Sequence, residues 1–256
     1  MNQNQLLQES TQCEYREGRK DEQLNLICHE LRTPLTAIVG NLLIAQLRLR
    51  HYAEMPEEDF SAVMQDISTL LARSLQQAQV QNRLIADLRD ASSNHANMFR
   101  ISFKRCDLGM LIHETVENQS AMAPGRTFSL ELPPEQPLYV MADRDRIGQV
   151  LSNYLTNAHK YSVADQPVTV GISLEEHEVR VWVRDQGPGL SIEAQQRIWQ
   201  RYYQEPGIHI QNDSEVGLGL GLYICQTLIA GHGGKVGVES REGMGSTFWF
   251  TLPRVE

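Results

Sequence analysis

A long alternation of apolar residues near the start of the chain limits its possible folds more than any other feature. Between residues 24 and 49 the apolar positions recur at alternating steps of four and three, the a/d pattern of a helix packed in a bundle. These positions are Leu24, Cys28, Leu31, Leu35, Ile38, Leu42, Ala45 and Leu49. Further apolar residues beside them widen the stripe, so the pattern predicts a helix that is covered on more than one side.

A second stretch repeats the pattern after a short break. The segment "HYAEMPEED" reads as a turn and a helix start, with Pro56 early and acidic residues at the positive end of the helix dipole. The second stripe is formed by Phe60, Val63, Ile67, Leu70, Ser74, Ala78, Gln81, Ile85 and Leu88. Because one hairpin cannot cover two such stripes, we expect residues 24–90 to form a homodimer with a four-helix bundle.

The stretch "CHELRTPL" interrupts the first helix with unusual chemistry. His29 falls about 100° from the Cys28 seam, so we expect it on the outer face beside Glu30, with Thr33 one turn later. Pro34 removes a backbone hydrogen bond and presses on the carbonyl of Glu30, which predicts a bend. By itself the motif favours a solvated histidine on a kinked helix, because surface histidines are common and so short a motif is weak.

Composition excludes several classes of protein. The 256 residues are enough for two domains, and a formal charge of −9 gives no general footprint for nucleic acid or an anionic membrane. The four cysteines are far apart, which argues against a disulfide framework or a zinc site, and the seam position of Cys28 predicts a buried thiol. No run is long enough to span a bilayer and no signal peptide is evident, so we expect a cytoplasmic chain without membrane contact.

From about residue 98 the pattern changes to short strands alternating with helices, which indicates an α/β domain. "FRISF", "RTFSLEL" and "LYVMA" are predicted strands, and Asp107 and Asp143 are predicted N-caps of two helices. The segments "PVTVGISLE" and "EVRVWVRD" alternate apolar residues around a polar turn, which predicts a hairpin buried on one side.

The helix that follows Asp143 carries polar residues on one face. Asn153 and Asn157 are four residues apart, and Lys160 lies one turn beyond Asn157. Amide oxygens suit a hydrated Mg²⁺, and an ammonium suits a phosphate. Asparagines at this spacing are also common as ordinary solvated positions, so the arrangement alone is weak evidence.

Two glycine-containing segments complete the candidate chemistry. Asp185 ends a predicted buried strand and precedes Gly187 and Gly189, where a carboxylate can accept a hydrogen bond from an adenine amino group. Gly217, Gly219 and Gly221 stand at the start of a predicted helix, where backbone amides suit phosphate oxygens. The preceding polar stretch, residues 204–216, is predicted to be a mobile lid.

Taken in order, "HELRTPL", "NYLTNAHKYS", "DQGPG", "IWQRYYQ", "GLGLGL" and "GMGSTF" resemble the six sequence boxes of bacterial sensor histidine kinases. The resemblance covers residues 20 to 253 and implies a dimeric helical hairpin followed by an α/β sandwich with a mixed sheet of the Bergerat ATP-binding type. It divides the chain into an N-terminal linker or stub at 1–22, a dimerisation and phosphotransfer hairpin at 23–95, and a catalytic domain at 98–256.

The resemblance also implies a role for each site residue. His29 resembles the phosphoacceptor, Glu30 its partner and Thr33 the residue that positions water for dephosphorylation of a partner's aspartate. ATP and Mg²⁺ are the implied cofactors. The implied nucleotide-binding residues are Asn153, Asn157 as the metal ligand, Lys160, Tyr161, Asp185, Gly187, Gly189, Gly217, Gly219 and Gly221.

By the same resemblance, the phosphoryl group passes from the histidine to the receiver domain of a separate response regulator, and a sensor module lies upstream or on another chain. A dimeric pseudokinase scaffold is the main alternative, although a pure scaffold has no need of His29, Asn157 and Asp185 together. A related chaperone or mismatch-repair type ATPase shares the ATP-binding fold but does not need the exposed His-Glu pair.

Overall fold

The structure of the protein is a computed structural model that describes residues 3–52, 60–92, 101–123, 125–133, 137–207 and 217–254. The chain divides into two compact units. The helical unit comprises residues 1–88 with 216–218, and the α/β unit comprises 89–215 with 219–256. Each unit is described by itself below.

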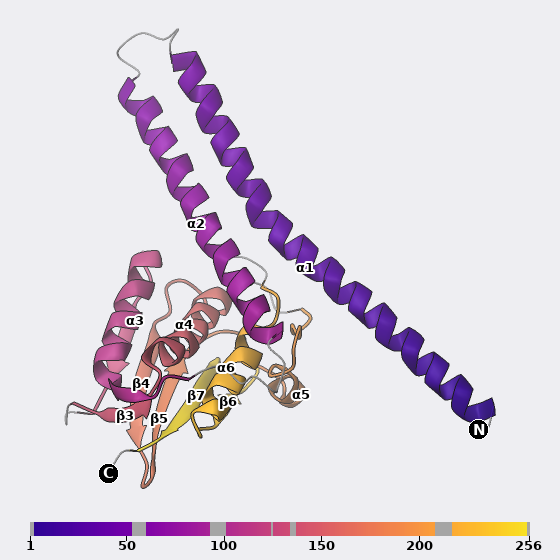
Figure 1. Ribbon diagram of the computed structural model, residues 1–256. Helices are drawn as coiled ribbons and strands as arrows, with labels where there is room; N and C mark the ends of the chain where they lie inside the picture. Colours follow the sequence, from indigo (N-terminus) through magenta and orange to yellow (C-terminus); the bar gives the residue numbers. More distant parts are fainter. Residues whose placement is uncertain are drawn as a thin grey trace. The chain divides into compact units, whose positions relative to one another are not determined.

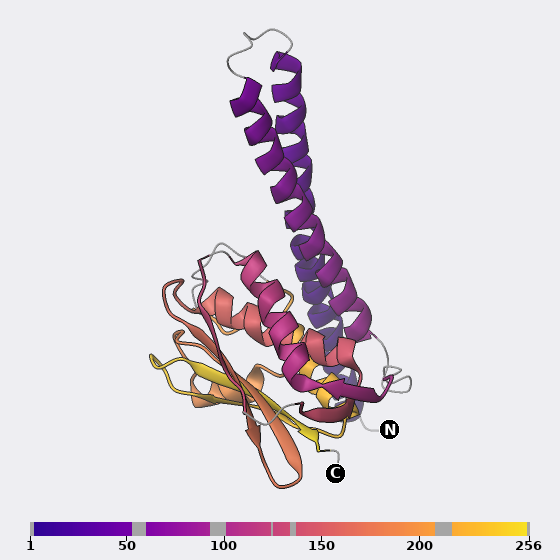
Figure 2. The same cartoon turned by 90° about the vertical axis from the view of Figure 1, so that its left-hand side faces the viewer.

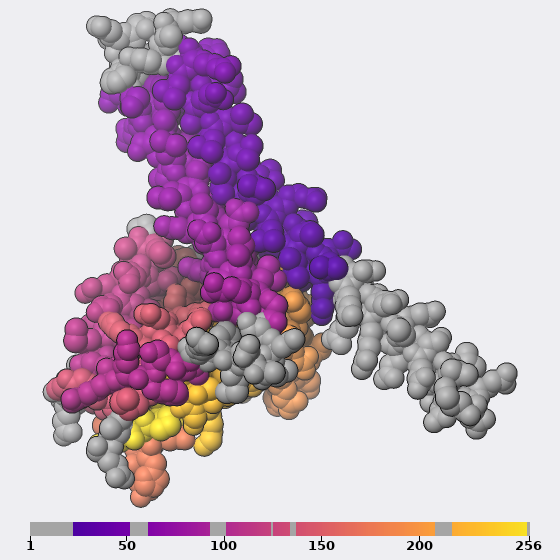
Figure 3. Space-filling view, in the orientation of Figure 1, coloured from indigo at the N-terminus to yellow at the C-terminus, as the bar shows by residue number. Residues whose placement is uncertain are grey.

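The helical unit is the predicted hairpin of two long helices (Figure 1). Helix α1 spans Gln3–Tyr52 and helix α2 spans Phe60–Ser92. Residues 3–22, which were expected to form a linker or stub, are helical. Helix α1 therefore begins well before the predicted start of the bundle. The two helices run side by side in the space-filling view (Figure 3), and an ion pair between Arg48 and Asp66 joins them.

Only half of the predicted α1 seam is covered in the single chain. One of its two heptad positions is covered from Leu31 onward, since Leu31 and Ile38 are half-buried and Ala45 is buried, whereas Leu24 at its start is exposed. The other heptad position is exposed at every occurrence, namely Cys28, Leu35, Leu42 and Leu49. We call these four residues the open row. The prediction of a buried Cys28 thiol is therefore wrong for the single chain, because the apolar stripe spans two faces and α2 covers only one.

On α2 the predicted stripe holds over most of its length. Ile67 and Ser74 are buried, with the Ser74 hydroxyl donating to the carbonyl of Leu70 at 2.9 Å. Near the carboxyl end Leu84 is buried instead of the predicted Ile85, which is exposed. Leu84 lies 14 residues after Leu70 and so continues the seven-residue repeat of the seam, whereas the predicted stripe leaves that repeat at Ala78 after two successive steps of four.

The α/β unit contains the remaining helices and strands. They are β1 Lys104–Asp107, α3 Leu108–Met122, β2 Phe128–Glu131, β3 Tyr139–Ala142, α4 Arg144–Tyr161, β4 Val168–Leu174, β5 Glu178–Arg184, α5 Ile192–Arg197, α6 Gly221–Gly231, β6 Val236–Ser240 and β7 Ser246–Pro253. The predicted N-caps are confirmed, since Asp107 accepts from the amide of Gly109 and Asp143 from that of Arg146.

The main sheet is mixed, as predicted, with strand order β2-β4-β5-β7-β6. Strands β2 and β4 are parallel, and the other neighbours are antiparallel, including the predicted β4–β5 hairpin. Strands β1 and β3 form a separate antiparallel pair. Residues 101–103 of the predicted strand "FRISF" are not in a strand, and β1 starts only at Lys104, so this prediction is wrong for those residues. Residues 99 and 100 lie outside the described part of the chain.

Helices α3, α4 and α6 lie on one face of this sheet (Figure 2). The residues between the layers are apolar and almost fully buried: Leu108, Ile112, Ile147, Leu151, Tyr154, Leu155, Val181, Ile224, Leu228 and Phe250. Within the described ranges, no helix is both long enough and apolar enough to cross a bilayer.

The opposite face of the sheet gives a test of how tightly it is packed. The Trp182 ring lies across Gly171, so a Cβ added there would come 2.1 Å from the indole. Gly171→Ala should lower the free energy of unfolding by about 1–3 kcal/mol, because the ring must move. Chemical denaturation measures the change.

Gly148→Ala in α4 is the matched control. Its added Cβ would meet Leu111 at 3.5 Å, an ordinary contact. Alanine is about 1 kcal/mol better than glycine inside a helix, so this variant should be at least as stable as the wild type. Equal losses in the two variants would contradict the assigned packing.

Candidate functional site

Helix α4 has an apolar face that packs in the core and a polar face on its other side. Ile147, Leu151 and Leu155 are buried, whereas Asn153 and Asn157 are half-buried on the other side. The apolar residues recur every four positions, so packing against the sheet fixes where the two amides lie. The predicted polar face of this helix is confirmed, but the role of Asn153 and Asn157 toward Mg²⁺ remains a prediction.

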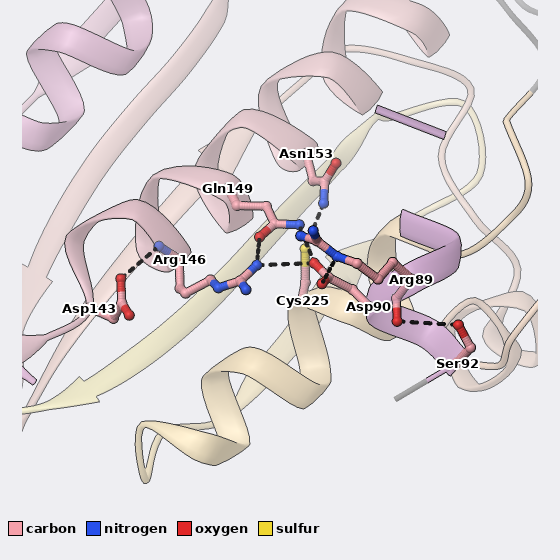
Figure 4. A network of polar contacts seen from close by, with 8 residues as sticks. All are labelled: Arg89, Asp90, Ser92, Asp143, Arg146, Gln149, Asn153 and Cys225. Atoms are coloured by element: carbon pink, nitrogen blue, oxygen red, sulfur yellow. Dashed lines mark hydrogen bonds and ion pairs between the residues drawn. The ribbon is translucent and has the colours of Figure 1, made fainter. Parts of the chain in front are cut away.

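Asn153 meets the start of α6. Its Nδ2 donates to Sγ of Cys225 at 3.6 Å (Figure 4). A Cβ added to Gly221, the first residue of α6, would come 3.5 Å from the Asn153 amide. The first residue of α6 therefore lies beside Asn153, and the free amides of a helix start suit a phosphate group.

Asp185 follows β5 and is 6% exposed. Its Oδ1 accepts hydrogen bonds from the amide of Gly187 at 2.7 Å and that of Ser246 at 3.3 Å. Among the described residues no hydrogen bond reaches Oδ2, which leaves that oxygen for a ligand amino group. Burial raises the pKa of Asp185, although these two amides and the charge of Arg126 act in the opposite direction.

The glycine after Asp185 brings the loop onto the end of α4. A Cβ at Gly187 would stand 2.9 Å from both Oδ1 of Asp185 and the carbonyl oxygen of Tyr161. Only glycine allows this approach without displacing its neighbours. The buried Asp185 acceptor thus lies in a loop that packs on the Tyr161 backbone, and a buried carboxylate of this kind fits the amino group of a nucleotide base.

The remaining glycines have different surroundings. Gly189 has φ +70° and packs on the backbone of Arg241, and Gly219 has φ +65° and packs on the backbone of Tyr203. Both conformations disfavour a side chain. Gly217 groups with the helical unit, so it is described apart from the glycines of the α/β unit.

Lys160 and Tyr161 end α4. Lys160 is 8% exposed, and its Nζ lies 5.3 Å from the centre of the Tyr161 ring. Burial raises the pKa of the Tyr161 hydroxyl. The sequence predicts a phosphate contact for Lys160, and a buried position beside an aromatic ring was not predicted.

A network of polar contacts joins the last turn of α2 to α4 within the α/β unit (Figure 4). The Asp90 carboxylate is 6% exposed and lies 3.0 Å from Nη1 of Arg146. Nε2 of Gln149 donates to the same oxygen of Asp90 at 3.2 Å. The sequence analysis missed this network, because Asp90 lies 56 residues from Arg146 and belongs to no motif.

The predicted His-Glu pair lies in the helical unit. The His29 side chain is 74% exposed and that of Glu30 is 8% exposed, with Nδ1 of His29 3.5 Å from Oε1 of Glu30. The Thr33 hydroxyl donates to the carbonyl of His29 at 3.1 Å. Helix α1 remains helical through Pro34, although its ribbon changes direction along its length (Figure 1).

One further prediction and one unpredicted residue concern the segments around the site. Of the predicted lid at 204–216, residues 208–216 lie outside the described part of the chain. Tyr202 was not singled out from the sequence, yet it has φ +62° and donates its amide to the carbonyl of Gly219 at 3.0 Å. Such a conformation is strained for a bulky residue, and no sequence pattern signals it.

Comparison with known families agrees with this geometry. Residues 19–97 match the family model of the His Kinase A (phospho-acceptor) domain. Residues 142–256 match the family described as histidine kinase-, DNA gyrase B- and HSP90-like ATPase. The second match covers α4, the Asp185 loop and α6, and the first covers the His29 helix.

Individual relatives give the same result. The chain is 33% identical over 238 residues to the adaptive-response sensory kinase SasA of Synechocystis sp., covering 91% of this chain and 59% of that protein. It is 30% identical to the solved catalytic domain of histidine kinase ThkA, with a TM-score of 0.51, over 60% of this chain and 99% of that domain. Full-length ShkA in complex with AMPPNP is 27% identical with a TM-score of 0.61, over 92% of this chain and 46% of that one.

ThkA has also been solved in complex with the response regulator protein TrrA. That structure covers all of this chain and 68% of the other, at 23% identity and a TM-score of 0.60, and it shows similarity of fold.

The fold and the two family matches define a helical hairpin of the His Kinase A (phospho-acceptor) type joined to a domain of the histidine kinase-, DNA gyrase B- and HSP90-like ATPase type. The chain belongs to the histidine kinase family. It spans about three fifths of the length of the SasA relatives.

Asp185 gives a prediction in which stability and binding change in opposite directions. Its pKa is raised above the usual 3.8 in the folded state, so ionisation at neutral pH destabilises the fold. This penalty is absent below the unfolded pKa and grows as the pH rises through the folded pKa. Asp185→Asn should therefore be at least as stable as the wild type at pH 7, and the difference should vanish toward pH 4.

The same substitution should weaken adenine nucleotide binding roughly 10- to 150-fold, the value of a hydrogen bond to a charged group. Thermal unfolding across pH and nucleotide titration measure the two effects. A variant that loses stability at pH 7 while binding nucleotide normally would contradict the role assigned to this carboxylate.

Proposed function

We propose that this chain is an ATP-dependent protein-histidine kinase of a two-component system, which accepts the γ-phosphoryl group of ATP on His29. The observation that carries the proposal is the pairing of an exposed imidazole with a buried carboxylate at His29 and Glu30. A merely solvated histidine has no need of a buried acceptor beside it, and burying a carboxylate is unfavourable unless it is paired, here with the His29 ring.

The geometry of the pair assigns a role to each ring nitrogen. Nδ1 of His29 is the nitrogen near Glu30, so a proton on Nδ1 is directed to the carboxylate and the lone pair remains on Nε2. Bound ATP with Mg²⁺ supplies the phosphoryl group: a bond forms between Nε2 and the γ-phosphorus while the bond to the ADP oxygen breaks. The Nδ1 proton then passes to Glu30 or to water.

The α/β unit supplies the nucleotide site. Asp185 accepts the adenine amino group, Tyr161 stacks on the base, and the start of α6 meets the phosphates beside Asn153. Asn157 offers an amide oxygen to Mg²⁺, which prefers oxygen ligands and keeps several waters and phosphates in its shell. Lys160 lies in the same last turn of α4 and adds positive charge near the phosphates.

We further propose that the phosphoryl group passes to an aspartate of a separate response regulator and that the same helix face removes it again. The complex of ThkA with TrrA supports a regulator as the partner. Thr33 lies one turn beyond His29, and its hydroxyl oxygen can hold a water near the same surface. The sensor would be an upstream segment or another chain, and the cytoplasm is the expected location.

A homodimer through residues 24–90 fits the helical unit. The open row of Cys28, Leu35, Leu42 and Leu49 repeats every seven residues, the spacing of a second bundle interface. Three of these side chains are leucines that are 45–50% exposed, and a second copy would remove them from water. We take residues 23–95 as the phosphotransfer hairpin and 98–256 as the catalytic domain.

Incubation of the purified chain with Mg²⁺ and γ-labelled ATP tests the proposal. We expect acid-labile, alkali-stable label on the protein, because a phosphorus–nitrogen bond has that stability. His29→Gln should reduce the label to the level of a blank, since no nucleophile remains at this position.

His51→Gln is the matched control, because His51 is an exposed histidine on the same helix. It should be labelled like the wild type. Nucleotide binding without acid-labile label in the wild type would instead support a scaffold that does not turn over, and label that survives in His29→Gln would refute the assignment of His29.

A further inference from the structure

Arg126 is an arginine in an unusual position. It lies between α3 and β2 and is 8% exposed, although arginine is seldom buried unless its charge is paired. No ion pair reaches its guanidinium from any residue within the described ranges. Desolvation lowers its pKa, and its Nε is buried without an acceptor among the described residues, so this placement is locally unfavourable.

The guanidinium instead closes the carboxyl-terminal end of α4. Nη1 donates to the carbonyl oxygen of Ser162 at 3.3 Å and to that of Val163, and Nη2 donates to the carbonyl of Ala158 at 3.4 Å and to the Ser162 hydroxyl. Of these acceptors the Ala158 carbonyl belongs to the last turn of α4, where it also accepts from the Ser162 amide at 3.2 Å, and the Ser162 and Val163 carbonyls directly follow the helix. The carboxyl-terminal end of a helix is the negative end of its dipole. A buried cation at this position therefore fixes the backbone at the end of the helix and complements its dipole.

This end of α4 carries residues of the nucleotide site. Tyr161 is the last residue of the helix, directly before Ser162, and its carbonyl oxygen faces Gly187 in the Asp185 loop. Displacement of the 158–163 backbone would therefore move the adenine-stacking ring and the surface on which the loop rests.

Arg126 also acts electrostatically on the base-binding carboxylate. Its positive charge lowers the pKa of Asp185 against the larger effect of burial, and so favours the ionised form. The other titratable groups that interact with the guanidinium are Asp165, which raises the pKa of Arg126, and His159, whose pKa Arg126 lowers.

We propose that Arg126 is a positioning residue for the nucleotide, which fixes the end of α4 on which Tyr161 and the Asp185 loop rest. This inference rests on the proposed function, because it deepens the assignment of the ATP site. The residue acts through Tyr161 and Asp185 and does not itself contact the base.

The test is titration of the full chain and its variants with AMPPNP and Mg²⁺ between pH 4.5 and 8, on proteins shown to be folded by circular dichroism. Arg126→Met should weaken binding about tenfold or more at pH 7, since hydrogen bonds from a charged donor are lost. It should also move the acidic loss of affinity to higher pH, because Asp185 then protonates more readily. AMPPNP also changes its protonation over this pH range, but that change is the same for every variant, so differences between variants come from the protein.

Arg126→Lys separates the two effects and serves as the test if Arg126→Met does not fold. Lysine keeps the charge but lacks the fork that reaches three carbonyls. It should therefore bind nucleotide more weakly at pH 7 while the acidic midpoint stays near that of the wild type. The pH series is repeated with His159→Gln, which removes the other group whose pKa depends on Arg126.

Arg105→Met is the matched control, because Arg105 is an exposed arginine of the same unit that lies 3.7 Å from the centre of the Tyr139 ring. It should leave both affinity and midpoint unchanged. Wild-type affinity and an unchanged acidic midpoint in folded Arg126 variants would overturn the inference while leaving the proposed function intact. Failure of the wild type to bind AMPPNP would overturn the proposed function, and this inference with it.

Discussion

The packing of one face of α4 against the mixed sheet is the constraint on which the α/β unit depends. Tyr154 is completely buried there, where its hydroxyl donates to the carbonyl of Trp249 at 3.3 Å and its ring lies 5.6 Å from that of Phe248. Once this face is fixed, the helical period also determines where Asn153 and Asn157 lie on the other side. Core packing thus sets the geometry of the polar face.

Both ends of α4 are also held by side chains from distant segments. At the amino end Asp143 caps the helix, and its own amide donates to Nε2 of the buried His232 at 3.0 Å. Nδ1 of His232 lies 2.8 Å from the carbonyl of Leu228, so the ring links α4 to α6. At the carboxyl end Arg126 donates to the carbonyls of Ala158, Ser162 and Val163. A helix fixed at both ends and along one face suits a ligand site that must be preorganised.

The parts predicted well from the sequence are those set by local periodicity. Helix α4, its Asp143 cap and the β4–β5 hairpin follow from spacing alone, and the ordered motifs around His29, Asn157 and Asp185 indicated the family. The α1 seam was only half right, because its wide apolar stripe does not say which face meets α2. Asp90 and Arg126 were missed, since their partners lie 30 to 60 residues away and neither belongs to a motif. Tertiary contacts at such separation carry no local signal.

Hydrogen–deuterium exchange with and without Mg²⁺ and AMPPNP tests the central claim most directly, because it reports which backbone segments the nucleotide orders. The account predicts slower exchange at the carboxyl-terminal end of α4, in the loop from Asp185 to Gly189 and at the start of α6. The open edge of the sheet at β2 should be unaffected. Protection that leaves residues 157–163 and 185–189 unchanged would contradict the proposal that the end of α4 is the centre of the nucleotide site.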